Sequence, residues 1–226
     1  MQHDISFLHT NRVHIPTFTK LINKMAPHLS VNHIVEAGLL EQARKDGMNI
    51  QLSTRIQNVM QAAASTGARV VVCTCSTIGA AAELAGNGQK FTAMRIDRPM
   101  TIQALKTGAR ILLAATLQST LAPTKELVAD SATKLGIPEN TYHTELLHIR
   151  QAWPYFEAGN KARYYQSIQN SLMASWKEFD VIVLAQASMS GVHSLCDDIK
   201  IPLLSSPTSG VQTAIEAFAQ YQKIRK

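Results

Sequence analysis

The cysteine at position 75 stands where a reactive thiol is expected. It ends an apolar run that begins at Ala68, and Ser76 and Thr77 follow it, ahead of residues 78–83, which are predicted to begin a helix. A helix N-terminus favours the thiolate, so we expect the Cys75 pKa to lie below about 8.5. Such a thiol is a usable base or nucleophile. The alternative is that Cys75 is a small buried hydrophobic residue, the commonest state of a free cysteine.

The other two cysteines are expected to be structural. Cys73 lies inside the apolar run, and Cys196 stands beside Asp197 and Asp198, whose charges disfavour a thiolate. Three cysteines are too few, and odd in number, for a disulfide framework, which favours a reducing cytoplasmic compartment. No further ligands stand near Cys73 and Cys75 at metal-binding spacing, so no metal is expected.

Hydroxyl side chains dominate the other positions that follow apolar runs. Together with helix N-termini they suit a small anionic ligand, although each alone could equally be a helix N-cap. These residues are Thr10, Ser76, Thr77, Thr116, Ser119, Thr120 and Ser188. His9 follows the first run and could bind a carboxylate or transfer protons, and it could equally be a structural histidine.

The sequence contains none of the common cofactor or hydrolase motifs. Residues 86–90 have neither the spacing of a phosphate-binding loop nor a Ser or Thr after Lys90, and Gly-x-Ser-x-Gly and His-Glu-x-x-His do not occur. We therefore expect chemistry without a nucleotide, a metal or a serine triad, and no cofactor.

Short apolar runs alternate with longer amphipathic segments, the pattern of parallel strands joined by crossover helices. The expected strands are residues 5–8, 31–35, 70–73, 91–96, 111–115, 144–148, 181–185 and 202–204.

The second half of the chain repeats landmarks of the first. Residues 68–79 align with residues 179–190, which places Gln186 opposite Cys75. Thr116 similarly corresponds to Thr10, residues 168–170 repeat the Ile-Gln-Asn of residues 56–58, and residues 205–207 stand in place of residues 97–99. Pro123-Thr124 is expected to open a helix as Pro16-Thr17 does, since proline suits the first helical position. Several landmarks in the same order indicate a duplicated α/β unit.

We therefore expect an α/β fold of two pseudo-symmetric lobes, each a four-stranded, mostly parallel sheet flanked by helices. Residues 1–98 with 208–226 are expected to form the first lobe and residues 99–207 the second. Ligands of open α/β sheets bind at the carboxyl ends of the strands, which predicts an active site in the cleft between the lobes.

Composition limits the class of protein. With 46% hydrophobic and 17% charged residues, the chain can bury a full core. The net charge is +6, and the one local cluster of basic residues in the sequence is Lys223, Arg225 and Lys226. No nucleic-acid-binding motif accompanies this cluster, so a solvated terminal helix is favoured over nucleic-acid binding. No apolar run reaches 18 residues and the first residues do not form a signal peptide, so no membrane association is expected.

Aromatic residues gather before the seventh strand. Trp153, Tyr155, Phe156, Tyr164 and Tyr165 could pack in the core, or could shield a site or form a subunit interface.

The triplet Cys75-Ser76-Thr77 resembles the first Cys-Asn-Thr motif of the aspartate/glutamate racemase superfamily, which also contains hydantoin racemases, maleate isomerases and arylmalonate decarboxylase. The resemblance covers nearly the whole chain and is greatest to a subgroup with a single active-site cysteine. It is carried further by Leu8-His9-Thr10, Asp97-Arg98-Pro99, Ala115-Thr116, residues 185–189 and Ser205-Ser206-Pro207.

The resemblance implies cofactor-independent proton transfer at the carbon alpha to a carboxylate. In the superfamily's racemases one cysteine removes a proton and a second returns one to the opposite face, and Cys75 would be one of the two. Gln186 stands where the second cysteine is expected, and an amide has no proton to exchange at neutral pH. The resemblance also implies a small carboxylate substrate and a homodimer or higher homo-oligomer.

Three functions follow. The first is a racemase-like isomerase with Cys75 as general acid/base and His9 or a water serving the second face. In this hypothesis Gln186 donates to the developing oxyanion, and the substrate is bound by His9, Thr10, Ser76, Thr77, Thr116, Thr120, Gln186, Ala187 and Ser188. The second is a one-base decarboxylase or lyase of the arylmalonate decarboxylase type. The third is a non-catalytic protein that binds a small carboxylate.

Overall fold

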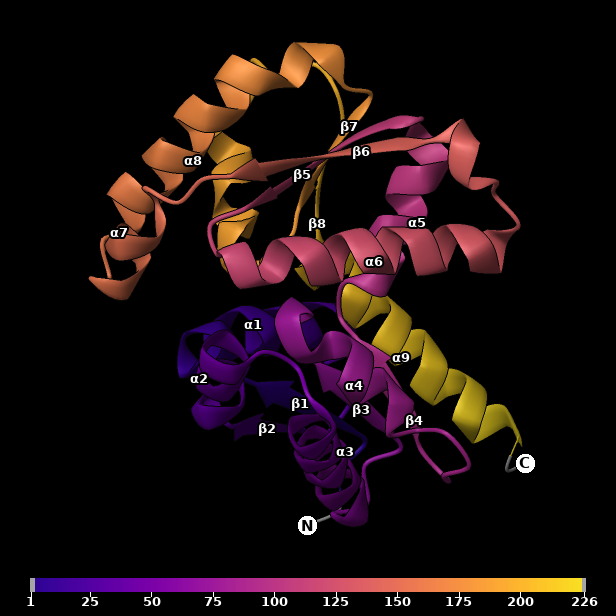
Figure 1. Ribbon diagram of the computed structural model, residues 1–226. Coiled ribbons are helices and arrows are strands. Elements are labelled where there is room, and N and C mark those ends of the chain that lie inside the picture. The colour runs from indigo at the N-terminus through magenta and orange to yellow at the C-terminus, as the bar shows by residue number, and fades with distance from the viewer. Residues whose placement is uncertain (1–2, 225–226) are drawn as a thin grey trace. The chain divides into compact units, whose positions relative to one another are not determined.

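The chain folds into two compact units, each built on a sheet of four parallel strands. The computed structural model describes residues 3–224. Unit 1 comprises residues 1–97 and 207–226, and unit 2 comprises residues 98–206. The strands of unit 1 are β1 (Ile5–His9), β2 (Val31–Val35), β3 (Val70–Cys73) and β4 (Thr92–Arg95), and those of unit 2 are β5 (Arg110–Ala115), β6 (His143–His148), β7 (Val181–Leu184) and β8 (Leu203–Ser205) (Figure 1). All eight expected strands are confirmed.

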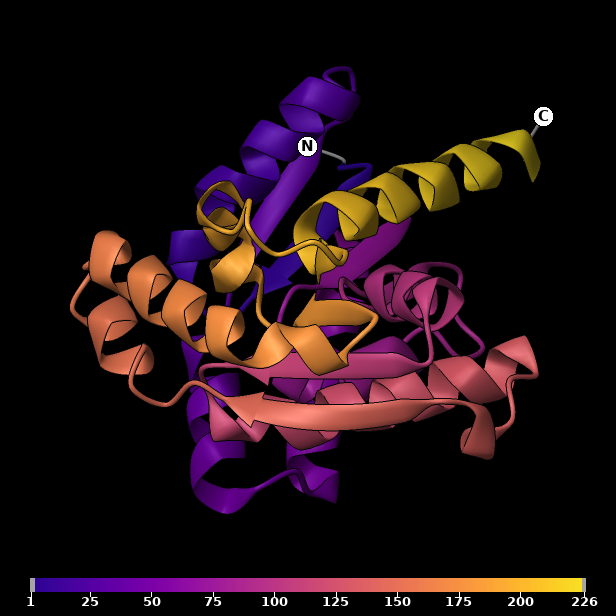
Figure 2. The same ribbon diagram turned by 90° about the horizontal axis from the view of Figure 1, so that it is seen from above.

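The two sheets have the same topology. Unit 1 has the strand order β2-β1-β3-β4 and unit 2 the order β6-β5-β7-β8, with every neighbouring pair parallel. Figure 2 shows β5 and β6 running side by side within unit 2, where six residues of each strand are paired. Matching orders confirm the expected α/β class and agree with the repeat in the sequence.

Helices cover both faces of the unit 1 sheet. They are α1 (Ile15–Met25), α2 (Ala37–Asp46), α3 (Ile50–Ser65), α4 (Gly79–Leu84) and α9 (Ser206–Ile224). Along β1, Leu8 belongs to the core with Leu52 and Ile56 of α3. The ring of Phe7 packs against Phe18 of α1, with the two ring centroids 5.4 Å apart. Successive residues of a strand face opposite sides, so β1 is buried on both. Asn49 caps α3 by accepting from Leu52 N at 2.9 Å.

Unit 2 is covered in the same way. Its helices are α5 (Arg98–Thr107), α6 (Gln118–Leu135), α7 (Trp153–Glu157) and α8 (Lys161–Ser175), with a long 3-10 segment at Ala187–Leu195. Leu112 of β5 packs with Ile168 of α8 on one face, and Leu113 packs with Met100 of α5 on the other. Figure 1 shows α6 and α8 on opposite sides of this sheet.

One expected helix start is wrong. Pro16 does lie in the first turn of α1, but Pro123 lies inside α6, which begins at Gln118. The start is fixed earlier because Thr120 N bonds to Leu117 O, and the helix continues past the proline. The cost of Pro123 is one missing backbone hydrogen bond, which this helix of 18 residues tolerates.

The aromatic segment packs on the core of unit 2. Tyr164 is buried, and Phe156 lies between it and Trp153 with ring centroids 5.2 and 4.8 Å away. Cys196 is buried in the same core, as expected of a structural cysteine. Of the basic residues near the C-terminus, Lys223 is exposed in the last turn of α9, and Arg225 and Lys226 lie outside the described residues.

None of the helices in the described part of the chain has the length and apolar composition that crossing a membrane requires.

Candidate active site

Thr10 and Cys75 meet at the carboxyl edge of the unit 1 sheet. Strands β1 and β3 are parallel neighbours, with Leu8 paired to Cys73, so the residues that follow them leave the sheet on the same side. The Thr10 hydroxyl is hydrogen-bonded to Cys75, as are the backbone N–H groups of Ile78 and Thr77 and the Thr77 hydroxyl. Four donors therefore converge on one sulfur atom, the arrangement that a thiolate requires.

The predicted depression of the Cys75 pKa is wrong for the resting protein. Burial raises the pKa of the thiol, and the hydrogen bonds from Thr10, Ile78 and Thr77 lower it by less. The dipole contribution is small because Cys75 leads into a single 3-10 turn, Ser76–Ile78, and α4 has only six residues. Cys75 is thus a protonated thiol at neutral pH with donors in place to hold a negative charge.

A buried ion pair lies under the Cys75 loop. Arg95 and Asp97 are 3% and 0% exposed, and the guanidinium donates to both carboxylate oxygens, Nε at 2.7 Å and one terminal nitrogen at 3.0 Å. The same terminal nitrogen donates to Ser76 O at 3.2 Å, and the Ser76 hydroxyl bonds to Asp97. Arg95 lowers the Asp97 pKa against the opposing effect of burial. The pair therefore fixes the residue next to Cys75 through both its backbone and its side chain.

His9 is held inside unit 1 by both ring nitrogens. The Thr74 hydroxyl donates to Leu8 O, so it accepts from His9 Nδ1 at 2.9 Å. His9 Nε2 is then an acceptor, 2.8 Å from His33 Nδ1, and His33 Nε2 accepts from the Thr19 hydroxyl at 3.0 Å. This order of bonds assigns one neutral tautomer to each histidine.

The environment of these histidines keeps them neutral. Burial, with smaller contributions from His33 and His14, lowers the His9 pKa to about 3. Burial also lowers the pKa of His14, to about 4, and the pKa of His33. His9 has no exposed surface. His9 therefore supports the loops after β1 and β3 and presents no ring nitrogen to a ligand.

In unit 2 the position equivalent to Cys75 is Gln186, after β7. Its Oε1 accepts from Thr116 N at 2.6 Å, from the Thr116 hydroxyl at 3.0 Å and from Leu117 N at 3.1 Å. Backbone N–H groups can only donate, so the amide must face them with its oxygen, and the Nε2 group is turned the other way. No hydrogen bond between the described residues uses Gln186 Nε2. Thr116 thus contacts Gln186 as Thr10 contacts Cys75.

The remaining expected residues of unit 2 surround the same edge of the β5–β7 pair. The Tyr164 hydroxyl lies 2.8 Å from Ser188 Oγ and 3.4 Å from Thr116 Oγ1, and burial raises its pKa to about 12, so it stays protonated. Ala187 begins the 3-10 segment after Gln186, and Thr120 is buried in the first turn of α6.

The structure therefore assembles two half-sites, one in each unit. Thr10, Cys75, Ser76 and Thr77 lie together in unit 1, and Thr116, Gln186 and Ser188 lie together in unit 2. Sequence reasoning missed Arg95, whose signal was an arginine and an aspartate two residues apart at the end of an apolar strand. It also missed the bonding of Tyr164. Among residues 3–224 no group of three His, Cys, Asp or Glu side chains is arranged to hold a metal ion.

No protein-family model and no curated protein matches this sequence.

Solved structures match it over nearly its whole length. A glutamate racemase from Bacillus anthracis has a TM-score of 0.70 at 16% identity, covering 98% of this chain and 82% of its own. A putative Asp/Glu racemase from Yersinia pestis has a TM-score of 0.68 at 14% identity, covering 97% of this chain and 100% of its own. A mutant of arylmalonate decarboxylase has a TM-score of 0.60 at 12% identity, covering 96% of this chain and 93% of its own. At these identities the likeness is one of fold, and this chain therefore has the two-unit α/β fold that Asp/Glu racemases share with arylmalonate decarboxylase.

Proposed function

We propose that this protein is a cofactor-independent, racemase-like isomerase that transfers a proton at the carbon alpha to a carboxylate, with Cys75 as general acid/base. The observation that carries the proposal is the set of four donors around the Cys75 sulfur. These donors stabilise the charge that the sulfur carries after giving up its proton, and a core cysteine would need none of them. The shared fold with Asp/Glu racemases supports the same reaction class.

Each half-site contributes a different function in this proposal. Cys75 exchanges a proton with the substrate carbon, and Thr10, Ser76 and Thr77 in unit 1 bind the substrate together with Thr116, Thr120, Ala187 and Ser188 in unit 2. Gln186 donates from Nε2 to the oxyanion that develops as the carbon loses its proton. Three donors fix the Gln186 oxygen, so the amide is already oriented to donate to the oxyanion and loses little conformational entropy when it does so.

A one-base decarboxylase or lyase is the second candidate, and two observations favour it. Burial keeps Cys75 protonated, which suits an acid that delivers a proton to an enediolate after carbon dioxide leaves. The Gln186 amide is neither acidic nor basic enough to exchange a proton with a carbon at neutral pH, and both ring nitrogens of His9 are engaged. Neither Gln186 nor His9 is therefore placed to make a second proton transfer, so another group or a water would have to serve the second face in a racemase.

The test is solvent exchange at the alpha carbon. The purified protein is incubated in deuterated water, without added cofactor, with a panel of amino acids, hydantoins and substituted malonates, and the alpha-proton signal is followed by NMR. We expect exchange or decarboxylation with at least one class, and its loss in Cys75→Ala and Cys75→Ser. Cys196→Ala is the matched control, because that cysteine is buried in the core of unit 2.

The label distinguishes the candidates. A racemic labelled product supports the isomerase, and a product of one handedness supports the one-base enzyme. Full turnover by Cys75→Ser contradicts both. Ligand-induced thermal stabilisation without any exchange supports a carboxylate-binding protein instead. The cytoplasmic location and the homodimer stay predictions.

A further inference from the structure

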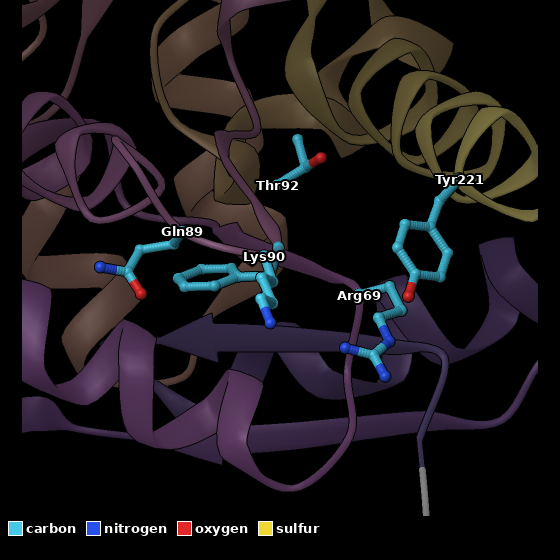
Figure 3. Close-up of a pocket in the computed structure, with 6 residues that line it drawn as sticks. Arg69, Gln89, Lys90, Thr92 and Tyr221 are labelled. Atoms are coloured by element: carbon cyan, nitrogen blue, oxygen red, sulfur yellow. The ribbon is translucent and has the colours of Figure 1, made fainter. Parts of the chain in front are cut away.

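A second pocket lies within unit 1, at the edge of the sheet opposite the Cys75 loop. It has a volume of about 650 Å³ and is lined by side chains from three segments: Arg69 before β3, residues 89–92 leading into β4, and Tyr221 in α9. Figure 3 shows Gln89, Lys90 and Thr92 on one segment, with Arg69 and Tyr221 beside it. Parallel strands β3 and β4 both start here and both end near Cys75, so the two sites are separated by the length of the strands.

Four of the lining side chains, those of Arg69, Gln89, Lys90 and Thr92, can donate hydrogen bonds but have no acceptor among the residues that the structure describes. Within the described residues neither Arg69 nor Lys90 makes an ion pair, the side chains of Gln89 and Thr92 make no hydrogen bond, and no carboxylate lines the pocket. The guanidinium of Arg69 is held under the Tyr221 ring, with Cζ 5.2 Å from the ring centroid. This cation–π contact orients a flat, five-donor group without neutralising it.

The chemistry of the lining defines the ligand. Two cations, an amide and a hydroxyl can donate to more oxygens than one carboxylate presents, whereas a phosphate group offers three oxygens and close to two negative charges. Phe91 adds an apolar wall next to Lys90. The volume lies in the range of small-molecule sites.

We propose that this pocket binds a small organic phosphate, with the phosphate group bound by Arg69 and Lys90 and the organic part against Phe91. The inference is independent of the reaction proposed for Cys75, because it rests on residues at the other edge of the sheet.

Isothermal titration calorimetry in a phosphate-free buffer of low ionic strength tests the proposal. The probes are phenyl phosphate, inorganic phosphate and succinate. We expect phenyl phosphate to bind more tightly than inorganic phosphate, because only the former contacts Phe91, and both to bind more tightly than succinate. Lys90→Gln and Arg69→Gln should each weaken phenyl phosphate binding by about tenfold, as expected for loss of a charge-assisted hydrogen bond.

Matched variants separate the site from general charge. Lys20→Gln removes an exposed lysine of α1 in the same unit and should leave binding unchanged. Arg69→Lys keeps the charge but not the planar fork and should still weaken binding, and circular dichroism melting shows whether each variant remains folded. Alkylation of Cys75 should not change the affinity of the protein for phenyl phosphate.

Four results would overturn the proposal: no heat with phenyl phosphate at about millimolar concentration, binding that survives both Lys90→Gln and Arg69→Gln, an equal loss in Lys20→Gln, or succinate binding as tightly as phenyl phosphate.

Discussion

Replacing Arg95 by methionine should strongly destabilise unit 1. Methionine is close to arginine in length, so the main change is the loss of the guanidinium, which removes the cationic partner of Asp97, a carboxylate that is 0% exposed in the wild type. Two charge-assisted bonds to Asp97 and one bond to Ser76 O disappear. Removal of one partner of a buried pair costs about 3–5 kcal/mol, and we expect Arg95→Met to lose this amount of unfolding free energy.

The two units can be followed separately. Both tryptophans, Trp153 and Trp176, belong to unit 2, and the candidate catalytic thiol belongs to unit 1. In urea, the rate of Cys75 alkylation, measured in a Cys73→Ala/Cys196→Ala background, reports opening of unit 1, and tryptophan fluorescence reports unit 2. Arg95→Met should shift the alkylation transition to lower urea with a smaller effect on fluorescence.

A double variant makes the reasoning refutable. Arg95→Met combined with Asp97→Leu removes both charges and should be more stable than Arg95→Met alone, because no unpaired carboxylate stays buried. In the wild type the Asp97 pKa is lowered on folding, so the ionised carboxylate stabilises the fold at pH values above the pKa of an ordinary aspartate. This stabilisation is lost as the pH falls and Asp97 becomes protonated. In Arg95→Met burial is opposed only by the hydrogen bonds from the Ser76 hydroxyl and the Asp97 backbone, so the Asp97 pKa is higher than in the wild type and the stability deficit should shrink as pH falls. Additive losses in the double variant, or a deficit independent of pH, would refute the uncompensated charge as the cause.

Three further changes have defined outcomes. Gln186→Leu leaves two backbone donors without their acceptor and should cost about 1–3 kcal/mol for each, seen as an earlier fluorescence transition in urea, whereas Gln186→Glu should keep most of the stability. Because the pKa values of His9 and His14 are lowered on folding to about 3 and about 4, the unfolded chain binds more protons below pH 6.5, and each of these two histidines should cost about 1.4 kcal/mol of unfolding free energy per pH unit between pH 6 and 5; a flat profile in calorimetric melts would contradict neutral burial. Gly79→Ala places a Cβ 2.9 Å from the Arg95 guanidinium carbon and should slow Cys75-dependent turnover by displacing the ion pair; unchanged turnover would exclude a positioning role for it.

Strands and duplication could be predicted from sequence because they follow from local pattern. Fully buried strands such as β3 and β7 are continuous apolar runs, and parallel topology requires crossover helices between them. The start of α6 could not be predicted in the same way. Pro123 suggested a helix start from local preference, but α6 begins after Leu117, whose N–H donates to Gln186 Oε1, about 70 residues away in the chain.

The chemistry of the half-sites divides in the same manner. Which residues come together in each half-site could be predicted, since residues that follow neighbouring parallel strands must lie at the same edge of the sheet. The direction of the Cys75 pKa was not, because it depends on burial by several elements, which outweighs the hydrogen bonds. The role of His9 could not be predicted either, because His33 of the neighbouring strand β2, which is paired with Phe7, is hydrogen-bonded to its second ring nitrogen.

The position of α9 in the chain has a consequence for biosynthesis. Unit 2 is continuous, so it can fold on the ribosome as soon as residue 206 has emerged. Unit 1 cannot close until α9 follows, and the buried Val211, Ala214 and Phe218 of α9 are then the last core residues to arrive. Until that moment the apolar surface that α9 covers, including Ile96 beside Gly210, is exposed in the nascent chain. The half-site that contains Cys75 is therefore the later of the two to be completed, and a translation pause after residue 206 would leave it open to aggregation and to chaperone binding.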